Sequence, residues 1–145
     1  MSDLKNRTTV TTPGVSSRPA RLRNVVVTGV VATLVAMAAV AATAALAEAV
    51  GVTFELPGGE AIPASGSAVM TGIFSAVGVV IAVTLRRWSA RPATVFVRVA
   101  VTLTAFSLVP PFLSGADSAT VAALILLHLV AATVMIPALA HRLRG

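Results

Sequence analysis

The fold of this chain is decided by an uninterrupted apolar stretch, VVVTGVVATLVAMAAVAATAALA, which occupies residues 25–47 and contains no charged residue. A helix rises 1.5 Å per residue, so a stretch of this length crosses a hydrocarbon core of about 30 Å. Three similar stretches follow at about residues 62–85, 93–112 and 119–140. Because all four are continuous rather than alternating, they predict transmembrane helices and not the strands of a membrane barrel.

The composition agrees with a chain whose solvent is mostly lipid. Hydrophobic residues make up 57 % of the sequence and charged residues 11 %, with a mean hydropathy of +0.94, whereas about 25 % of a soluble domain is charged. Four buried helices of a soluble bundle would need polar faces that these stretches lack. We therefore predict an all-α fold, an integral membrane four-helix bundle with up-down topology. The absence of cysteine excludes disulfides and thiolate metal sites.

Basic residues predict how the chain is threaded. Ten of the eleven Lys and Arg residues flank the spans on one side of the membrane: Lys5, Arg7, Arg18, Arg21, Arg23, Arg86, Arg87, Arg91, Arg142 and Arg144. The two connections on the other side carry Glu55, Glu60 and Asp117 and no basic residue. The positive-inside rule then places both termini in the cytoplasm (N-in/C-in) of a protein of the inner, or plasma, membrane.

The net charge of +6 has two interpretations, nucleic-acid binding and contact with lipid. A nucleic-acid surface needs a basic face with aromatic or motif support, and the chain has no Tyr and one Trp. The charges sit at the ends of the predicted helices, where anionic headgroups attract them. We therefore expect the lipid bilayer, and no nucleic acid, as a partner.

Two domains are predicted, a tail at residues 1–23 and a transmembrane domain at residues 24–143. The tail is polar and without apolar periodicity, which predicts a disordered cytoplasmic segment. A competing interpretation is a signal peptide, because residues 45–47 (Ala-Leu-Ala) resemble a signal-peptidase site. The apolar run before them exceeds the 7–15 residues of a typical signal peptide, which favours an uncleaved first span.

Small residues predict which helix faces meet, because close backbone approach drives helix association in lipid. In the second span they recur at helical spacing: Ser67, Thr71, Ser75, Gly78 and Ala82. Gly72 and Ala76 lie beside this stripe. The first span offers a similar one: Met37, Ala41, Ala44 and Ala45, ending at Glu48. A pore or cleft lined by the same hydroxyls is the alternative to packing.

Three prolines bear on the later spans. Pro110 and Pro111 should end the third span, because proline lacks a backbone donor and clashes with the preceding turn. Pro137 lies inside the fourth span, one turn from its predicted cytoplasmic end, where it would kink the helix. Proline is frequent in membrane helices, so it does not by itself indicate gating.

Ionisable residues inside a span are the default functional candidates, because their desolvation must be compensated. His128 lies near the middle of the fourth span and is a candidate proton relay, haem ligand or ligand contact. Its structural alternative is an inter-helix hydrogen bond from a neutral imidazole. His141 cannot complete a bis-histidine haem site with it, because thirteen helical residues separate them by roughly 20 Å.

Arg98 and Glu48 are the other two candidates in the spans. Arg98 lies four or five residues inside the third span and shares its face with Thr94, Thr102 and Ala105, which suggests an inward orientation. The alternative is a snorkelling side chain whose guanidinium reaches the headgroups. Glu48 closes the first span at the outer interface, where a carboxylate stays hydrated, and it should not pair with Arg98.

The first outer connection, FELPGGEAIP at residues 54–63, is the least generic segment. Two prolines and a Gly-Gly pair predict a shaped turn. Glu55 and Glu60 are candidates to bind a cation or a basic partner, although two carboxylates are too few for a calcium site. The glycines are not a phosphate loop, because the Lys and Ser/Thr of that motif do not follow.

A family resemblance is carried by this loop and by three further segments: residues 85–88 (LRRW), 107–110 (SLVP) and 127–139 (LHLVAATVMIPAL). Over residues 24–143 the chain resembles a family of small four-span actinobacterial membrane proteins catalogued as a domain of unknown function. The resemblance implies the four-helix topology and no activity. Its recurring polar positions match Glu55, Glu60, Arg98 and His128.

The sequence favours a non-enzymatic accessory or interaction protein that binds another membrane protein, lipid or a second copy of itself. It carries no nucleophile–base pair, metal cluster or cofactor motif, so no metal and no cofactor is expected. One alternative is a small oligomeric transporter of a solute or proton that uses His128 and Arg98. Small multidrug exporters also have four spans, but they place a Glu deep within span one, whereas Glu48 lies at the edge of the first span here. The other alternative is a haem-binding or redox membrane protein.

Overall fold

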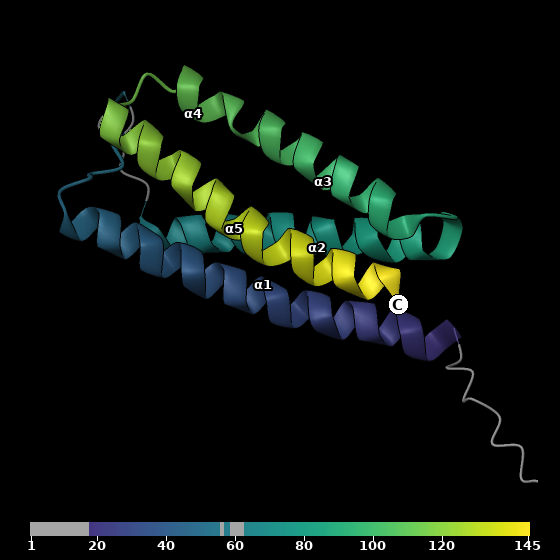
Figure 1. Cartoon of the computed structure of the whole chain (residues 1–145). Coiled ribbons are helices and arrows are strands. Elements are labelled where there is room, and N and C mark those ends of the chain that lie inside the picture. The colour runs from purple at the N-terminus through teal and green to yellow at the C-terminus, as the bar shows by residue number, and fades with distance from the viewer. Residues whose placement is uncertain (1–17, 56, 59–62) are drawn as a thin grey trace, which may run out of the picture.

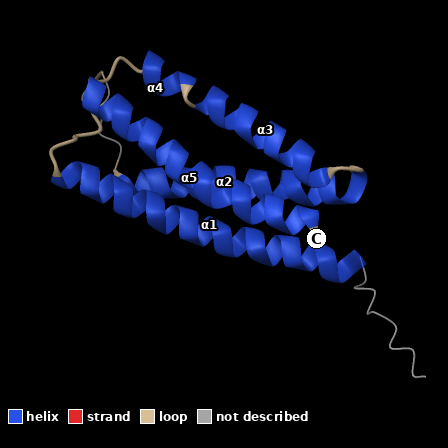
Figure 2. Cartoon of the chain, in the orientation of Figure 1, coloured by secondary structure: helices blue, strands red, loops and turns tan. Residues whose placement is uncertain are grey.

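The computed structural model describes residues 18–55, 57–58 and 63–145. They form five helices and no regular strand: α1 (Arg18–Ala49), α2 (Ala64–Trp88), α3 (Pro92–Ser107), α4 (Val109–Leu113) and α5 (Ser118–Arg144) (Figures 1 and 2). α3 and α4 together make the third of four segments long and apolar enough to cross a membrane. The predicted all-helical fold and four apolar helices are thus confirmed for this part of the chain, and they suggest membrane insertion.

The long helices alternate in direction, so the start of α1, the α2–α3 turn and the end of α5 lie at one end of the molecule (Figure 1). Helices that follow each other along the chain pack side by side, and α1 also packs extensively against α5. Among the described residues α1 and α3 make no contact. The four spans therefore form a closed ring in which α1 and α3 lie diagonally opposite.

The start of α1, the α2–α3 turn and the end of α5 carry most of the arginines, and we call this end of the bundle the basic end. Helix ends differ from the predicted boundaries mainly there. α1 begins at Arg18, well before residue 25, and α5 continues to Arg144. Hydropathy detects apolar spans, whereas Arg and Leu are also good helix formers and extend a helix beyond the lipid core. Basic residues in the last turn of α5 further suit the negative end of its dipole. Residues 1–17 of the predicted tail lie outside the described residues.

The prediction for Pro110 and Pro111 is wrong in detail. α3 already ends at Ser107, and the two prolines belong to the single helical turn α4 that starts at Val109. Proline is tolerated in the first turn of a helix because the backbone N–H it lacks would have no partner there. The prolines therefore begin a new turn and extend the third span to Leu113. α5, in contrast, runs through Pro137 without ending.

Small residues fill the interface between α1 and α2. A Cβ added to Gly29 would lie 2.5 Å from Cγ2 of Val79, and one added to Gly72 would lie 2.9 Å from Sδ of Met37. A methyl group at Gly29 would therefore clash with a stiff β-branched side chain, and one at Gly72 would force the flexible Met37 to turn aside.

The predicted packing stripe of α2 turns toward the bundle. Ser75 and Ala82 are buried, while Ser67, Thr71 and Gly78 are half-buried. A Cβ on Gly78 would meet no atom within 4 Å, so this glycine is not required for close packing.

The stripe predicted for α1 lies only partly on the inner face. Ala44 is buried and Met37 and Ala41 are half-buried, but Ala45 and Glu48 are exposed. The buried face consists of Val25, Gly29, Ala32, Ala36, Val40 and Ala44. Because alanine occurs on almost every face of this helix, residue size alone does not identify the inner one.

Two apolar clusters fill the bundle, one toward each end. The larger, toward the basic end, is built around Val25, Phe96, Met135 and Leu139. The smaller joins Val40, Ala44, Ala123 and Leu127 to Phe54 of the α1–α2 connection. Large apolar side chains also cover the outside, where Phe74 is 71 % and Phe106 69 % exposed. Large exposed apolar surfaces are rare on soluble monomers, so this exterior fits a lipid environment.

Candidate functional site

The end of the bundle that holds the C-terminus is organised by arginines from three helices. Arg86 of α2 donates from Nη1 to the carbonyl of Leu143 at 2.9 Å, and Arg21 of α1 donates to the oxygen of Gly145 at 3.0 Å. The last carbonyls of a helix have no partner within that helix. Side chains from the first two spans therefore satisfy the end of α5.

Arg142 adds a third contact at the same end. Its Nε donates to Oγ1 of Thr28 on α1 at 2.9 Å, which joins the first and last spans. These three arginines lie among the ten basic residues that the sequence placed on one side of the membrane. Part of that positive charge therefore also has a structural use.

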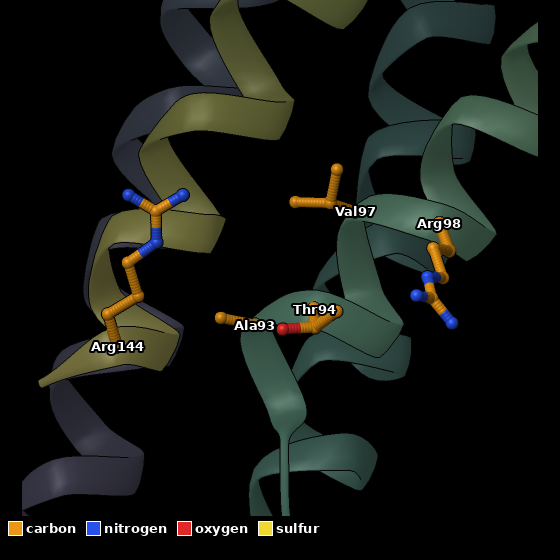
Figure 3. Close-up of a pocket in the computed structure, with 5 residues that line it drawn as sticks. All are labelled: Ala93, Thr94, Val97, Arg98 and Arg144. Atoms are coloured by element: carbon orange, nitrogen blue, oxygen red, sulfur yellow. The ribbon is translucent and has the colours of Figure 1, made fainter.

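A shallow hollow of about 360 Å³ lies between the start of α3 and the end of α5 at this basic end. Its lining consists of Ala93, Thr94, Val97, Arg98 and Arg144. Figure 3 shows Arg144 extending along α5 on one side of the hollow, whereas Arg98 extends away from it on the outer side of α3. The hollow combines a small apolar wall, one hydroxyl and the guanidinium of Arg144, and Arg98 borders it with its guanidinium directed away.

The inward orientation suggested for Arg98 is wrong for the single chain. Arg98 and its stripe neighbours Thr94, Thr102 and Ala105 are all exposed. The buried residue of α3 is Phe96, which packs into the larger apolar cluster. Phe96 fills more of the interior than any threonine would, and this apolar burial sets the rotation of the helix. The position of Arg98, six residues into α3, suits the snorkelling alternative.

His128 is half-buried in α5 and forms a hydrogen bond within its own helix. Nδ1 lies 2.7 Å from the carbonyl of Leu124, rather than bonding to another helix as the structural alternative expected. A carbonyl only accepts, so Nδ1 carries the proton and Nε2 of the neutral ring keeps its lone pair. The ring therefore retains one nitrogen that can accept a proton or bind a metal. His141, the second histidine of α5, is exposed at the basic end.

The acidic candidates lie at the opposite end of the bundle. Glu48 is exposed in the last turn of α1, and Glu55 is exposed in the connection that follows. Glu60 lies outside the described residues. Within the described ranges no three His, Cys, Asp or Glu side chains gather into a possible metal site. Glu48, Arg98 and His128 therefore belong to separate parts of the molecule.

Asp117 is a residue that the sequence reasoning treated only as a loop charge. Its Oδ1 accepts hydrogen bonds from the backbone N–H groups of Ala119 at 2.8 Å and Thr120 at 3.1 Å, and Oδ2 accepts from Oγ1 of Thr120 at 2.6 Å. These bonds, led by that of the Thr120 hydroxyl, lower the pKa of Asp117 below its usual value of 3.8. An Asp immediately before an apolar helical run is the sequence signal of such an N-cap.

Phe54 is the second feature that the sequence reasoning missed. Its side chain is 1 % exposed although it belongs to a connection between helices, and its φ of 51° lies in the left-handed region. A bulky residue rarely adopts this conformation, because its Cβ crowds the backbone. The ring closes the smaller apolar cluster between α1 and α5. The end of the bundle opposite the C-terminus is therefore sealed by an aromatic side chain.

The chain matches a known family of sequences. The sequence model described as "Family of unknown function (DUF6069)" matches residues 20–145. No curated protein and no solved structure is significantly similar to the chain. The match confirms the resemblance to a family of unknown function. It does not bear on the actinobacterial origin or the four-span architecture of that family, which stay predictions.

Proposed function

The chain belongs to the DUF6069 family, whose function is unknown, and we propose that it is a non-enzymatic interaction protein of the inner membrane. In this proposal four helices span the bilayer, the basic end faces the cytoplasm, and the protein acts by binding lipid and neighbouring membrane proteins. The membrane setting is supported by the four apolar helices. The orientation is supported by arginines at one end and by Glu48, Glu55 and Asp117 at the other.

The observation that carries the proposal is the separation of the ionisable candidates. Arg98 lies on the outer face of α3, His128 donates to its own helix, and Glu48 lies at the far end of α1. Acid–base catalysis and coupled transport both require groups that reach a common substrate. The interior between these residues is filled by Ala, Val, Leu, Met and Phe side chains. An arrangement of this kind favours binding at the surface over chemistry inside the bundle.

The orientation is tested by labelling single cysteines, because the chain has none of its own. Ala90 lies exposed in the α2–α3 turn at the basic end, and Thr53 lies exposed in the α1–α2 connection. In intact cells a membrane-impermeant maleimide should label Thr53→Cys, whereas Ala90→Cys should react only after the membrane is permeabilised. The opposite pattern, or equal labelling of both, would refute the proposed topology.

The two alternatives, transport and a redox role, are tested separately. Transport is tested by reconstitution into liposomes that contain a pH-sensitive dye. We expect no proton flux above that of empty liposomes. A flux that disappears in His128→Ala or Arg98→Ala would overturn the proposal in favour of transport. A haem absorbance band that copurifies with the protein and is lost in His128→Ala would overturn it in favour of a redox role.

A further inference from the structure

The arginines at the basic end differ in their hydrogen bonding. Arg21, Arg86 and Arg142 donate to oxygens of Gly145, α5 or α1 and hold the spans together. No hydrogen bond or ion pair to any residue that the structure describes is made by the side chains of Arg23, Arg87, Arg91, Arg98 and Arg144. Of these, Arg98 and Arg144 line the hollow between α3 and α5.

No carboxylate side chain of the described chain lies near enough to neutralise them. Glu48, Glu55 and Asp117, the acidic residues within the described ranges, all lie at the other end of the bundle. The main-chain oxygen of Gly145 already accepts from Arg21. Neither Arg98 nor Arg144 is therefore paired with a carboxylate side chain of the described chain.

The chemistry of the lining fits a phosphate group. A guanidinium presents a planar fork of N–H donors that matches phosphate oxygens, and the Thr94 hydroxyl adds a further donor. The apolar wall formed by Ala93 and Val97 suits the glycerol and upper acyl carbons of a lipid. Basic pockets between helices near the cytoplasmic surface are a known setting for anionic headgroups.

The side chains have the freedom that such a site requires. Arg98 and Arg144 are exposed, and long exposed side chains exchange rotamers within nanoseconds. Arg144 already extends beside the hollow, and Arg98 borders it from the outer side of α3 (Figure 3). A phosphate seated against the first turn of α3 would thus be approached from both sides.

We propose that this hollow binds the phosphate group of an anionic membrane lipid, held by Arg144 and Arg98 and by the hydroxyl of Thr94. The inference rests on the proposed function, because a lipid reaches the hollow only if the basic end lies at a headgroup layer. Free inorganic phosphate shares the chemistry of the headgroup and is distinguished from it by the experiment.

The test is native mass spectrometry of the full chain released from nanodiscs that contain phosphatidylglycerol and phosphatidylcholine. The double variant Arg98→Gln/Arg144→Gln is compared with Arg87→Gln/Arg91→Gln. The control removes the same charge from exposed residues at the same end but outside the hollow. We expect retained phosphatidylglycerol to fall at least roughly tenfold more in the first variant, because the loss of even one of the two charge-assisted contacts has an effect of that size.

Equal losses in the two variants would show that lipid is held by diffuse charge and would overturn the proposal. Circular dichroism of both variants controls for folding, and their exposed positions predict unchanged helix content. An excess of inorganic phosphate that displaces the lipid from the wild-type protein would assign the hollow to free phosphate. Retention of the lipid against that excess is the result expected of a headgroup site.

The outcome separates this inference from the proposed function. Equal losses in the two double variants would leave a membrane interaction protein without a defined lipid site. A reversed cysteine-labelling pattern would refute the orientation, whereas lipid retention in nanodiscs would still be measurable, because both leaflets contain phosphatidylglycerol.

Discussion

Three glycines in the first two spans allow the α1–α2 interface to be tested with a graded series of alanine substitutions. A new Cβ at Gly29 would meet Cγ2 of Val79 at 2.5 Å, and one at Gly72 would meet Sδ of Met37 at 2.9 Å. At Gly78 it would meet nothing within 4 Å. The same chemical change thus ranges from a severe clash to open space.

The magnitudes follow from these distances. Carbon atoms prefer separations of about 3.5–4.0 Å, so Gly29→Ala must move Val79 or the helix by about 1 Å. Val79 is β-branched and has little rotamer freedom, so an overpacking cost of about 1–3 kcal/mol is expected. Met37 is flexible and can turn aside, which makes Gly72→Ala milder. Gly78→Ala should stabilise the fold by about 0.5–1 kcal/mol, because alanine loses less backbone entropy in a helix.

Thermal unfolding of the purified protein in detergent measures the series. A change of 1 kcal/mol shifts the melting temperature of a chain of this size by roughly 4 °C. Gly29→Ala should lower the melting temperature, and Gly78→Ala should raise it. In a Val79→Ala background the cost of Gly29→Ala should fall sharply, because the two γ carbons that clash are gone and only the Cβ contact at 3.3 Å remains. Equal destabilisation by Gly29→Ala and Gly78→Ala, or an unchanged cost in the Val79→Ala background, would refute this account of the interface.

Three further predictions concern the ends of the bundle. Phe54→Ala should cost about 3–5 kcal/mol in thermal unfolding, because it empties a buried aromatic site; a melting temperature equal to the wild-type value would show that Phe54 does not seal the bundle. The Asp117 carboxylate, whose pKa is lowered, should contribute stability above about pH 4 that is lost as pH falls through its folded pKa. Thr120→Val should move that loss to higher pH in an acid titration followed by circular dichroism, and an unmoved titration would contradict the Thr120 hydrogen bond. Arg86→Gln removes the donor to Leu143, so hydrogen exchange should quicken in the last turn of α5, and unchanged protection there would contradict that contact.

The sequence was sufficient to predict the spans, because a long apolar run in a helix is recognised from its hydropathy. It was less informative at the polar ends of the helices, as at Arg18 and Arg144, since helix propensity continues after hydropathy has fallen. It also misjudged Pro110 and Pro111, because proline ends one helix and begins another with the same chemistry. That proline interrupts a helix is thus easier to predict than the residue at which one helix ends and the next begins.

The candidate site depended on spatial relations that a single sequence does not specify. The outward orientation of Arg98 follows from the burial of Phe96 on the same helix, and its polar neighbours gave the opposite impression. The contact of Gly29 with Val79 depends on the relative register of two helices, which no local pattern sets. The hollow beside Arg144 exists only because the start of α3 meets the end of α5.

The closure of the ring between α1 and α5 has a consequence for biogenesis. α1 is synthesised before α5, yet its buried face packs against both α2 and α5, and Arg142 of α5 bonds to Thr28 of α1. Until residues 118–144 have been made, the part of that face which α5 covers has no partner within the chain. A chain interrupted before Ser118 would leave this row of small side chains uncovered. The native packing of α1 is therefore completed only when the last helix has been synthesised.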